Sequence, residues 1–191
     1  MKAAVAVVDM LADNLGTGKH SAMERQGAAL VPCLRDLLAR CRRRGVPVIY
    51  ANDSFLPGDA LFGGRMQPHA LRGTPGARVV DELAPEPGDL ELPKRRFSAF
   101  FKTDLDQTLR TWGVDTLAVC GITTPFCVLA TALDAVAHDF RAVILEDAST
   151  AHRDEVHEAC LGLYRKNPLW PLLRVETAEA FLQAAERGDW A

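Results

Sequence analysis

The fold is decided by one stretch near the middle of the chain: Thr116-Leu117-Ala118-Val119-Cys120-Gly121-Ile122-Thr123-Thr124-Pro125-Phe126-Cys127. Its apolar first part predicts a buried strand, and a helical pattern begins around Cys127, so a free thiol lies at a strand-to-helix turn. Unpaired N–H groups and the helix dipole favour negative charge there, and we expect the pKa of the Cys127 thiol to be lowered. Most free cysteines are small buried hydrophobes, so position alone does not establish a nucleophile.

Short apolar runs alternate with longer helical patterns on both sides of this stretch. Strands are predicted at residues 3–8, 46–51, 116–120, 142–145 and 173–175, and helices at 24–43, 101–112, 127–138 and 178–187. Strands that are apolar throughout are typical of a parallel sheet buried on both faces. The pattern predicts an α/β protein with a three-layer α/β/α, Rossmann-like fold, a mainly parallel sheet and a single domain over residues 1–191.

Composition and charge narrow the class of protein. The 191 residues are 48% hydrophobic and 25% charged, with a net charge of −3, as in an ordinary soluble domain. We expect no nucleic-acid partner, because nucleic-acid-binding proteins usually carry a basic face. We expect no membrane partner, because no apolar run is long enough to span a bilayer. Five cysteines without metal-binding or disulfide spacing indicate a cytoplasmic protein. No Gly-rich phosphate motif occurs, and no cofactors are expected.

Polar residues follow the predicted strands at the edge where open parallel sheets bind ligands. Asp9 follows the first strand, Asp53 the second, and the turn with Cys127 the third. Lys94 is one of only five lysines among 22 basic residues, which suggests that its ammonium matters. Residues 56–88 are rich in Gly and Pro and predict a long irregular loop, either a lid over the site or a subunit contact.

Several segments together resemble one known family. They are Val7-Val8-Asp9-Met10, Arg72-Gly73-Thr74-Pro75-Gly76-Ala77, residues 94–100, Gly121-Ile122-Thr123-Thr124, and Cys127-Val128. In these segments the sequence is similar to the isochorismatase-like cysteine hydrolases, a superfamily that includes nicotinamidase, N-carbamoylsarcosine amidase and isochorismatase. The resemblance covers most of the chain, and it implies a small-molecule substrate and a homodimer or homotetramer.

The resemblance also implies roles for individual residues. Asp9, Lys94 and Cys127 match the family's catalytic triad, and Ile122-Thr123 matches its non-proline cis peptide. The backbone N–H groups of Thr123 and Cys127 are then expected to form an oxyanion hole. Asp9 takes the thiol proton, Lys94 orients the carboxylate, and Cys127 attacks a carbonyl carbon to form a thioester acyl-enzyme. The expected target is the C–N bond of a small amide or ureido compound.

The end of the second strand departs from the metal-binding members of that family. Nicotinamidases carry Asp-x-His there and a later histidine, whereas this chain has Asp53 and Phe55 and matches only the later histidine, with His69. One carboxylate and one imidazole make a poor zinc site, so we expect no metal and assign Asp53 to a hydrogen bond in the pocket. Phe55 and Phe126 are candidates for an apolar wall of the substrate pocket, although aromatic residues more often lie in a core.

Two other functions stay open at this point. Family members that cleave the vinyl ether of isochorismate do not need the thiol, so the chain could instead be a vinyl-ether hydrolase that uses Asp9 as an acid. The third hypothesis is a non-enzymatic redox or binding module with Cys127 as its reactive thiol. The retained thiol favours C–N chemistry, and replacing Cys127 by alanine should abolish that activity while sparing vinyl-ether cleavage.

Overall fold

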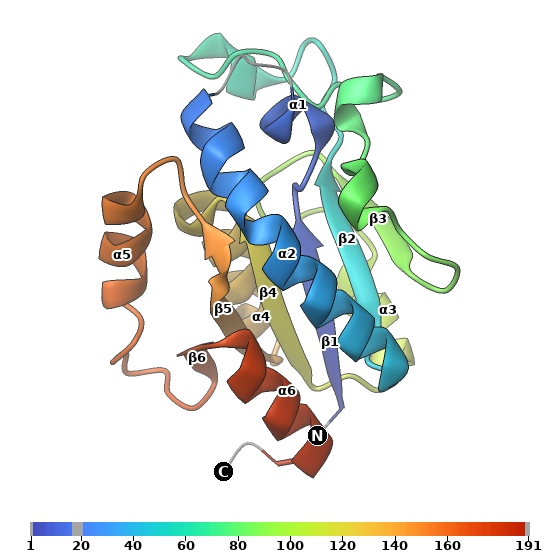
Figure 1. Ribbon diagram of the computed structural model, residues 1–191, viewed down its shortest axis with the longest axis vertical. Helices are drawn as coiled ribbons and strands as arrows, with labels where there is room; N and C mark the ends of the chain where they lie inside the picture. Colours follow the sequence, from blue (N-terminus) through green and yellow to red (C-terminus); the bar gives the residue numbers. More distant parts are fainter. Residues whose placement is uncertain (1, 17–20, 190–191) are drawn as a thin grey trace.

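A six-stranded, fully parallel sheet forms the centre of the molecule (Figure 1). The computed structural model describes residues 2–16 and 21–189. The spatial order is β3-β2-β1-β4-β5-β6, so the chain changes direction across the sheet between β1 and β4, where open α/β sheets form their ligand crevice. The strands are β1 (Ala3–Val8), β2 (Val48–Asp53), β3 (Leu90–Lys94), β4 (Thr116–Ile122), β5 (Arg141–Thr150) and β6 (Leu173–Glu176).

Helices cover both faces of this sheet. Helices α2 and α6 pack on one face, and α3, α4 and α5 contribute to the core on the other, so the predicted three-layer α/β/α fold is confirmed. The bounds are α1 (Ala12–Leu15), α2 (Ser21–Arg43), α3 (Leu105–Thr111), α4 (Leu129–Ala137), α5 (Asp154–Gly162) and α6 (Ala178–Arg187). No helix in the described part of the chain is long and apolar enough to cross a membrane.

Strand β1 shows why the sheet needs both layers. Ala4, Ala6 and Val8 join the core on the α3 and α4 side, whereas the alternate residues of the strand join the core on the α2 and α6 side. Every residue of β1 is buried. Burial on both faces explains why the strand is apolar without the alternation of a half-exposed strand.

Several elements differ from the sequence-based prediction. Strand β3 was not predicted, because it is a short edge strand that contains Pro93 and has exposed alternate residues, which edge positions tolerate. Helix α3 begins at Leu105 rather than at residue 101, after a series of turns. Helix α5 was also missed, and β5 continues well beyond the apolar run at 142–145.

The loop of residues 56–88 is irregular, as predicted, apart from three short 3-10 turns. Figure 1 shows it above the carboxyl ends of the central strands. Backbone hydrogen bonds anchor two points in its second half: the N–H of Arg72 donates to the carbonyl oxygen of Phe55, and the N–H of Val80 donates to that of Met10. Asp59 adds ion pairs to Arg95 and to the neighbouring arginine, just beyond β3. The loop is therefore held over the edge of the sheet.

Candidate active site

Asp9 follows β1 directly and adopts an unusual backbone conformation. Its φ is 55°, in the left-handed region that aspartate tolerates better than most residues. Contacts on both sides hold it: the side-chain amide of Asn14 donates to the carbonyl oxygen of Asp9 at 2.9 Å, and the N–H of Asp53 donates to Asp9 Oδ1 at 2.7 Å. These contacts fix the carboxylate of Asp9 at the end of the strand.

Strand β4 approaches β1 very closely just before the turn that carries Cys127. A Cβ atom on Gly121, where φ is 101°, would lie 2.3 Å from the carbonyl oxygen of Val8, so only glycine fits. The Ile122–Thr123 peptide bond that follows is cis. The chain then forms a π-helical turn, Thr124–Val128, and continues into α4. The close approach brings the turn beside the residue that follows Val8, which is Asp9.

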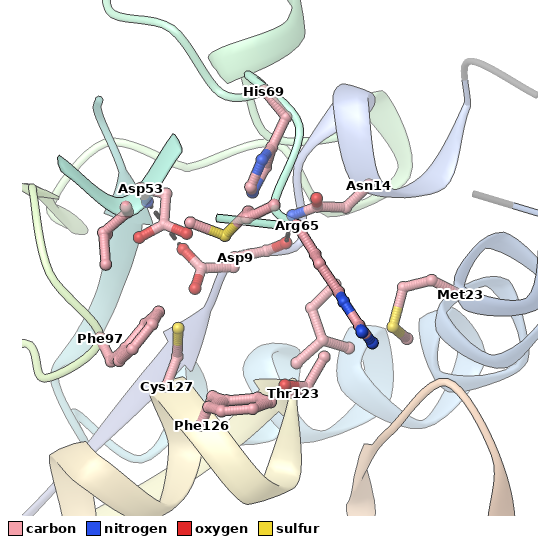
Figure 2. A pocket seen from close by; sticks show the side chains of 13 residues that line it. Asp9, Asn14, Met23, Asp53, Arg65, His69, Phe97, Thr123, Phe126 and Cys127 are labelled. Atoms are coloured by element: carbon pink, nitrogen blue, oxygen red, sulfur yellow. Dashed lines mark hydrogen bonds between the residues drawn. The ribbon is translucent and has the colours of Figure 1, made fainter. Parts of the chain in front are cut away.

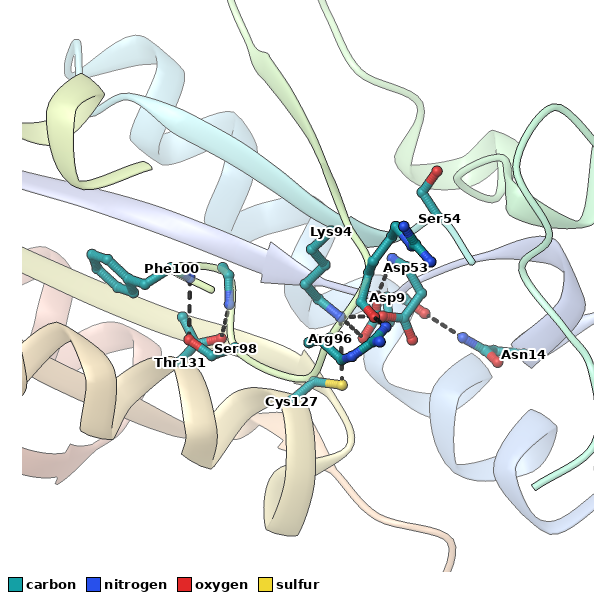
Figure 3. Close-up of polar contacts among 12 residues, drawn as sticks. Asp9, Asn14, Asp53, Ser54, Lys94, Arg96, Ser98, Phe100, Cys127 and Thr131 are labelled. Atoms are coloured by element: carbon teal, nitrogen blue, oxygen red, sulfur yellow. Dashed lines mark hydrogen bonds and ion pairs between the residues drawn. The ribbon is translucent and has the colours of Figure 1, made fainter. Parts of the chain in front are cut away.

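Lys94 ends β3, and three side chains share its ammonium group (Figure 3). Its Nζ donates to Asp9 Oδ2 at 2.9 Å, donates to Asp53 Oδ1, and lies 3.5 Å from Cys127 Sγ. Lys94 is only 1% exposed, and a buried ammonium is costly unless it is paired. Asp9, Lys94 and Cys127, predicted from three separate places in the sequence, therefore lie together with Asp53 in one buried cluster.

The pKa of the Cys127 thiol lies well above its ordinary value. Burial is the largest cause and the negative charge of Asp9 adds to it, whereas Lys94 acts in the opposite direction. The prediction of a lowered pKa is therefore wrong for the resting protein, because burial and the facing carboxylate outweigh the local backbone dipoles. The sulfur keeps its proton at rest and faces a carboxylate that can accept it.

Burial and neighbouring charges also determine the pKa values of Asp53 and Lys94. Burial raises the pKa of Asp53 to about 7, and the nearby charge of Asp9 adds to the effect while Lys94 opposes it. Burial would lower the pKa of Lys94, but the nearby negative charges of Asp9 and Asp53 outweigh this effect and raise that pKa. The cluster thus keeps a permanent ammonium, and Asp53 exchanges its proton near neutral pH.

A cavity of about 440 Å³ opens above this cluster (Figure 2). Asp9, Asp53 and Cys127 reach it from the sheet edge, and residues of the 56–88 loop form the far wall. Its lining residues are Asp9, Asn14, Met23, Asp53, Leu61, Arg65, Met66, His69, Phe97, Ile122, Thr123, Phe126 and Cys127. The ring of Phe126, which is 55% exposed, packs 5.5 Å from that of Phe97. Carboxylates and a thiol therefore face a mainly apolar space of small-molecule size.

Phe55 does not line this cavity, so its assignment to the substrate wall is wrong. The ring is fully buried, because it packs in a small core with Leu11 and Ala70. Its ring centroid lies 5.4 Å from that of His69, edge to face, and His69 does line the cavity. Phe55 supports the wall from behind, whereas Asp53 and Phe126 reach the cavity as predicted.

A family model described as the isochorismatase domain matches residues 3–176. The chain belongs to the isochorismatase family. The resemblance inferred from the strand-end motifs is therefore confirmed.

Individual relatives of this isochorismatase-family chain include amidohydrolases. A maleamate amidohydrolase of Pseudomonas putida is 34% identical over 131 residues, which are 65% of this chain and 62% of that enzyme. A protein of Arabidopsis thaliana named a probable inactive nicotinamidase is 34% identical over 166 residues, 82% of this chain and 84% of that protein. The solved N-carbamoylsarcosine amidase of Thermoplasma acidophilum is 31% identical, with a TM-score of 0.79, and the match covers 94% of this chain and 98% of that chain.

A solved pyrazinamidase of Pyrococcus horikoshii, to which this chain is similar, is in complex with zinc, whereas the described residues of this chain form a cluster that suits a metal ion poorly. Among the described residues, one group of possible ligands comes together: Asp9, Asp53 and Cys127, whose ligand atoms lie within 4.8 Å of one another. The ammonium of Lys94 contacts all three, so a cation already bridges them. Phe55, which stands where a histidine would be needed, offers a buried ring. The hydrogen bond between Asp53 and Lys94 matches the role predicted for Asp53.

Other residues of this isochorismatase-family site gave no signal in the sequence. His157 of α5 forms a 2.8 Å hydrogen bond with the hydroxyl of Thr124, which is fully buried, and so ties the Cys127 turn to a helix that was not predicted. Burial lowers the pKa of His157. Met23, Arg65 and Met66 line the cavity from segments without a recognisable motif. Only the folded chain brings them to the site.

Proposed function

We propose that this chain is a cysteine-dependent amidohydrolase that cleaves the C–N bond of a small amide or ureido compound. One observation carries the proposal: the ammonium of Lys94 links the carboxylate of Asp9 and the sulfur of Cys127 at the floor of a cavity. This arrangement joins a nucleophile to a proton acceptor and a cation, as thiol catalysis requires. The names of the maleamate amidohydrolase and the N-carbamoylsarcosine amidase support the bond type.

The first half of the reaction forms a thioester. Cys127 passes its proton to Asp9 as the sulfur attacks the carbonyl carbon, so the S–C bond forms only when the base is in place. The raised pKa of the thiol fits this order, because proton transfer accompanies attack. Asp9 then gives the proton to the leaving nitrogen as the C–N bond breaks, and ammonia or an amine departs.

The second half of the reaction regenerates the thiol. A water molecule gives a proton to Asp9 and attacks the thioester carbon, and the proton returns to the sulfur as the S–C bond breaks. Lys94 stays charged throughout and holds the carboxylate of Asp9 toward the sulfur.

The oxyanion of each tetrahedral intermediate needs hydrogen-bond donors. We assign this role to the backbone N–H groups of Thr123 and Cys127, and no residue within the described ranges accepts a hydrogen bond from the Thr123 N–H. Donors of this type contribute about 3–4 kcal/mol each in comparable sites. The expectation of a cytoplasmic homodimer or homotetramer stays a prediction.

Ammonia release from a panel of small amides, ureido compounds and lactams tests the proposal. Wild-type protein is compared with Cys127→Ala and with Cys160→Ala, which removes another buried cysteine, on α5. We expect turnover by wild type and by Cys160→Ala, and a loss of about 10⁴-fold or more in Cys127→Ala.

Two results would contradict the proposed function. Turnover that survives in Cys127→Ala removes the thiol from the mechanism. The second result is that no compound of the panel is turned over, while both wild type and Cys127→Ala cleave an isochorismate-type vinyl ether. The protein would then be a vinyl-ether hydrolase.

A further inference from the structure

Charge is distributed unevenly around the cavity. Its floor carries the carboxylates of Asp9 and Asp53, whereas Arg65, on the 56–88 loop, supplies the one permanent positive charge among the lining residues that the structure describes. Figure 2 shows the Arg65 side chain reaching across the cavity, with its guanidinium end toward Met23 and away from Phe97. A small molecule in this space therefore meets negative charge at one end and positive charge at the other.

No carboxylate in the described part of the chain neutralises the Arg65 guanidinium. Within residues 2–16 and 21–189, Arg65 forms no ion pair with a carboxylate. Other arginines around the site are paired: Arg95 and Arg96 both contact Asp59. A guanidinium presents a planar fork of N–H donors that matches a carboxylate in two parallel hydrogen bonds. Arg65 is thus available to an anion that enters the cavity.

The second cation of the site cannot take this role. The side chain of Lys94 is fully buried and its ammonium is shared among Asp9, Asp53 and Cys127. An anionic group placed there would lie against two carboxylates. Repulsion by these two carboxylates directs an anionic group of the ligand to the end of the cavity that holds Arg65. The other end of the ligand then lies above the sulfur of Cys127.

We propose that Arg65 binds a carboxylate of the substrate, so that the substrates are small amides or ureido compounds with a carboxylate a few atoms from the scissile carbonyl. This inference rests on the proposed function and names the substrate class of the same site. The apolar wall of Phe97, Ile122 and Phe126 contacts the short hydrocarbon link between the two groups. Arg65 makes and breaks no bond; it determines specificity by orienting the carbonyl toward Cys127.

Matched pairs of compounds test the proposal. Each pair consists of an anionic amide or urea and a neutral analogue: succinamate with butanamide, and 3-ureidopropionate with propylurea. The ratio of kcat/KM values, anionic over neutral, is measured for wild type, Arg65→Met, Arg65→Lys and Arg78→Met. Arg78 is an exposed arginine of the same loop that lies outside this cavity, so its variant controls for loss of net charge.

We expect wild type and Arg78→Met to favour the anionic member of each pair, and Arg65→Met to lower the ratio about 10- to 100-fold. Arg65→Lys should keep part of the preference, because it retains the charge but loses the fork geometry. Equal turnover of both members by wild type, or an equal loss on both in Arg65→Met, overturns the inference and leaves the proposed function intact.

A binding measurement keeps the two proposals separable if no compound is turned over. Calorimetry with succinamate and with 3-ureidopropionate is performed on Cys127→Ala and on Cys127→Ala combined with Arg65→Met. A dissociation constant 10- to 100-fold weaker in the double variant supports the carboxylate site without reference to catalysis. Equal affinities, or no binding of either anionic probe to Cys127→Ala, overturn it.

Discussion

The sheet edge and the 56–88 loop build the same cavity in different ways. At the edge, Asp9, Lys94 and Cys127 are buried at strand ends and held by mutual hydrogen bonds and a close backbone contact. On the loop, Arg65 and Met66 follow a stretch with little regular structure, and Arg65 is exposed. The difference suggests that the edge supplies reactive groups that must not move, whereas the loop supplies contacts that select a ligand.

Replacing Asp9 is expected to have the largest effect on catalysis at the sheet edge. In Asp9→Asn the amide oxygen can still accept the N–H of Asp53, but the side chain can no longer take the thiol proton. We expect kcat to fall about 10²- to 10⁴-fold, as for loss of a general base, with the fold retained by circular dichroism. Asp115→Asn, at the opposite end of the sheet, is the control. A loss below tenfold would show that another group takes the proton.

Lys94→Met tests how the edge is held together. Two buried carboxylates would then face each other without a cation, so we expect the free energy of unfolding to fall by about 3–5 kcal/mol at pH 8. The loss should be smaller at pH 5, where Asp53 can take up a proton. Urea unfolding at both pH values measures the effect, and the exposed Lys102→Met should change stability by less than about 0.5 kcal/mol. Equal destabilisation by both variants contradicts the account.

The sequence predicted the edge better than the loop, for a physical reason. Asp9 and Asp53 follow apolar runs, and parallel strands end at one edge, so local patterns place both residues. Lys94 was singled out by the scarcity of lysine and by family motifs and not by a strand pattern, because β3 is too short and too polar at its alternate residues to be recognised. Phe55 was misassigned because the strand pattern gives no account of the small core that buries it. Arg65 belongs to no periodic pattern, so its place in the cavity depends wholly on tertiary structure.

The pKa of Cys127 shows a second limit of sequence reasoning. The strand-to-helix turn correctly locates the thiol, and local dipoles argue for a lower pKa. Burial and the charge of Asp9, 118 positions earlier in the chain, reverse the direction. Long-range contacts therefore decide the protonation of a residue whose position local patterns predict.

The protonation of Asp53 makes the stability of the folded protein depend on pH. The folded-state pKa, about 7, lies above the ordinary value of 3.8, so the protonated form favours folding, and this stability is lost as the pH rises from about 4 through 7. Between pH 5 and 8 we expect wild type to lose about 3 kcal/mol relative to Asp53→Asn. Urea unfolding across that range measures the difference. Parallel stability curves for the two proteins would exclude the raised pKa.

The smallest effect is expected where the loop is attached. Asp59 binds Arg95 and Arg96, and Asp59→Asn weakens both ion pairs. Because the loop carries ligand contacts but no reacting group, KM should rise about 2- to 5-fold while kcat is unchanged. Steady-state kinetics separates the two parameters, with the exposed loop variant Asp81→Asn as control. A fall in kcat with unchanged KM would show that the loop also acts on the chemistry.

Trapping the acyl-enzyme is the decisive measurement for covalent catalysis by Cys127. Wild-type protein is mixed with an amide that it turns over, quenched in acid within the first turnover, and analysed by mass spectrometry of the intact chain and of its peptides. We expect a mass increase equal to the acyl group on the peptide that contains Cys127, with one equivalent of ammonia or amine released, and no adduct in Cys127→Ala. Product formation without an adduct on Cys127, or an adduct on another cysteine, would contradict it.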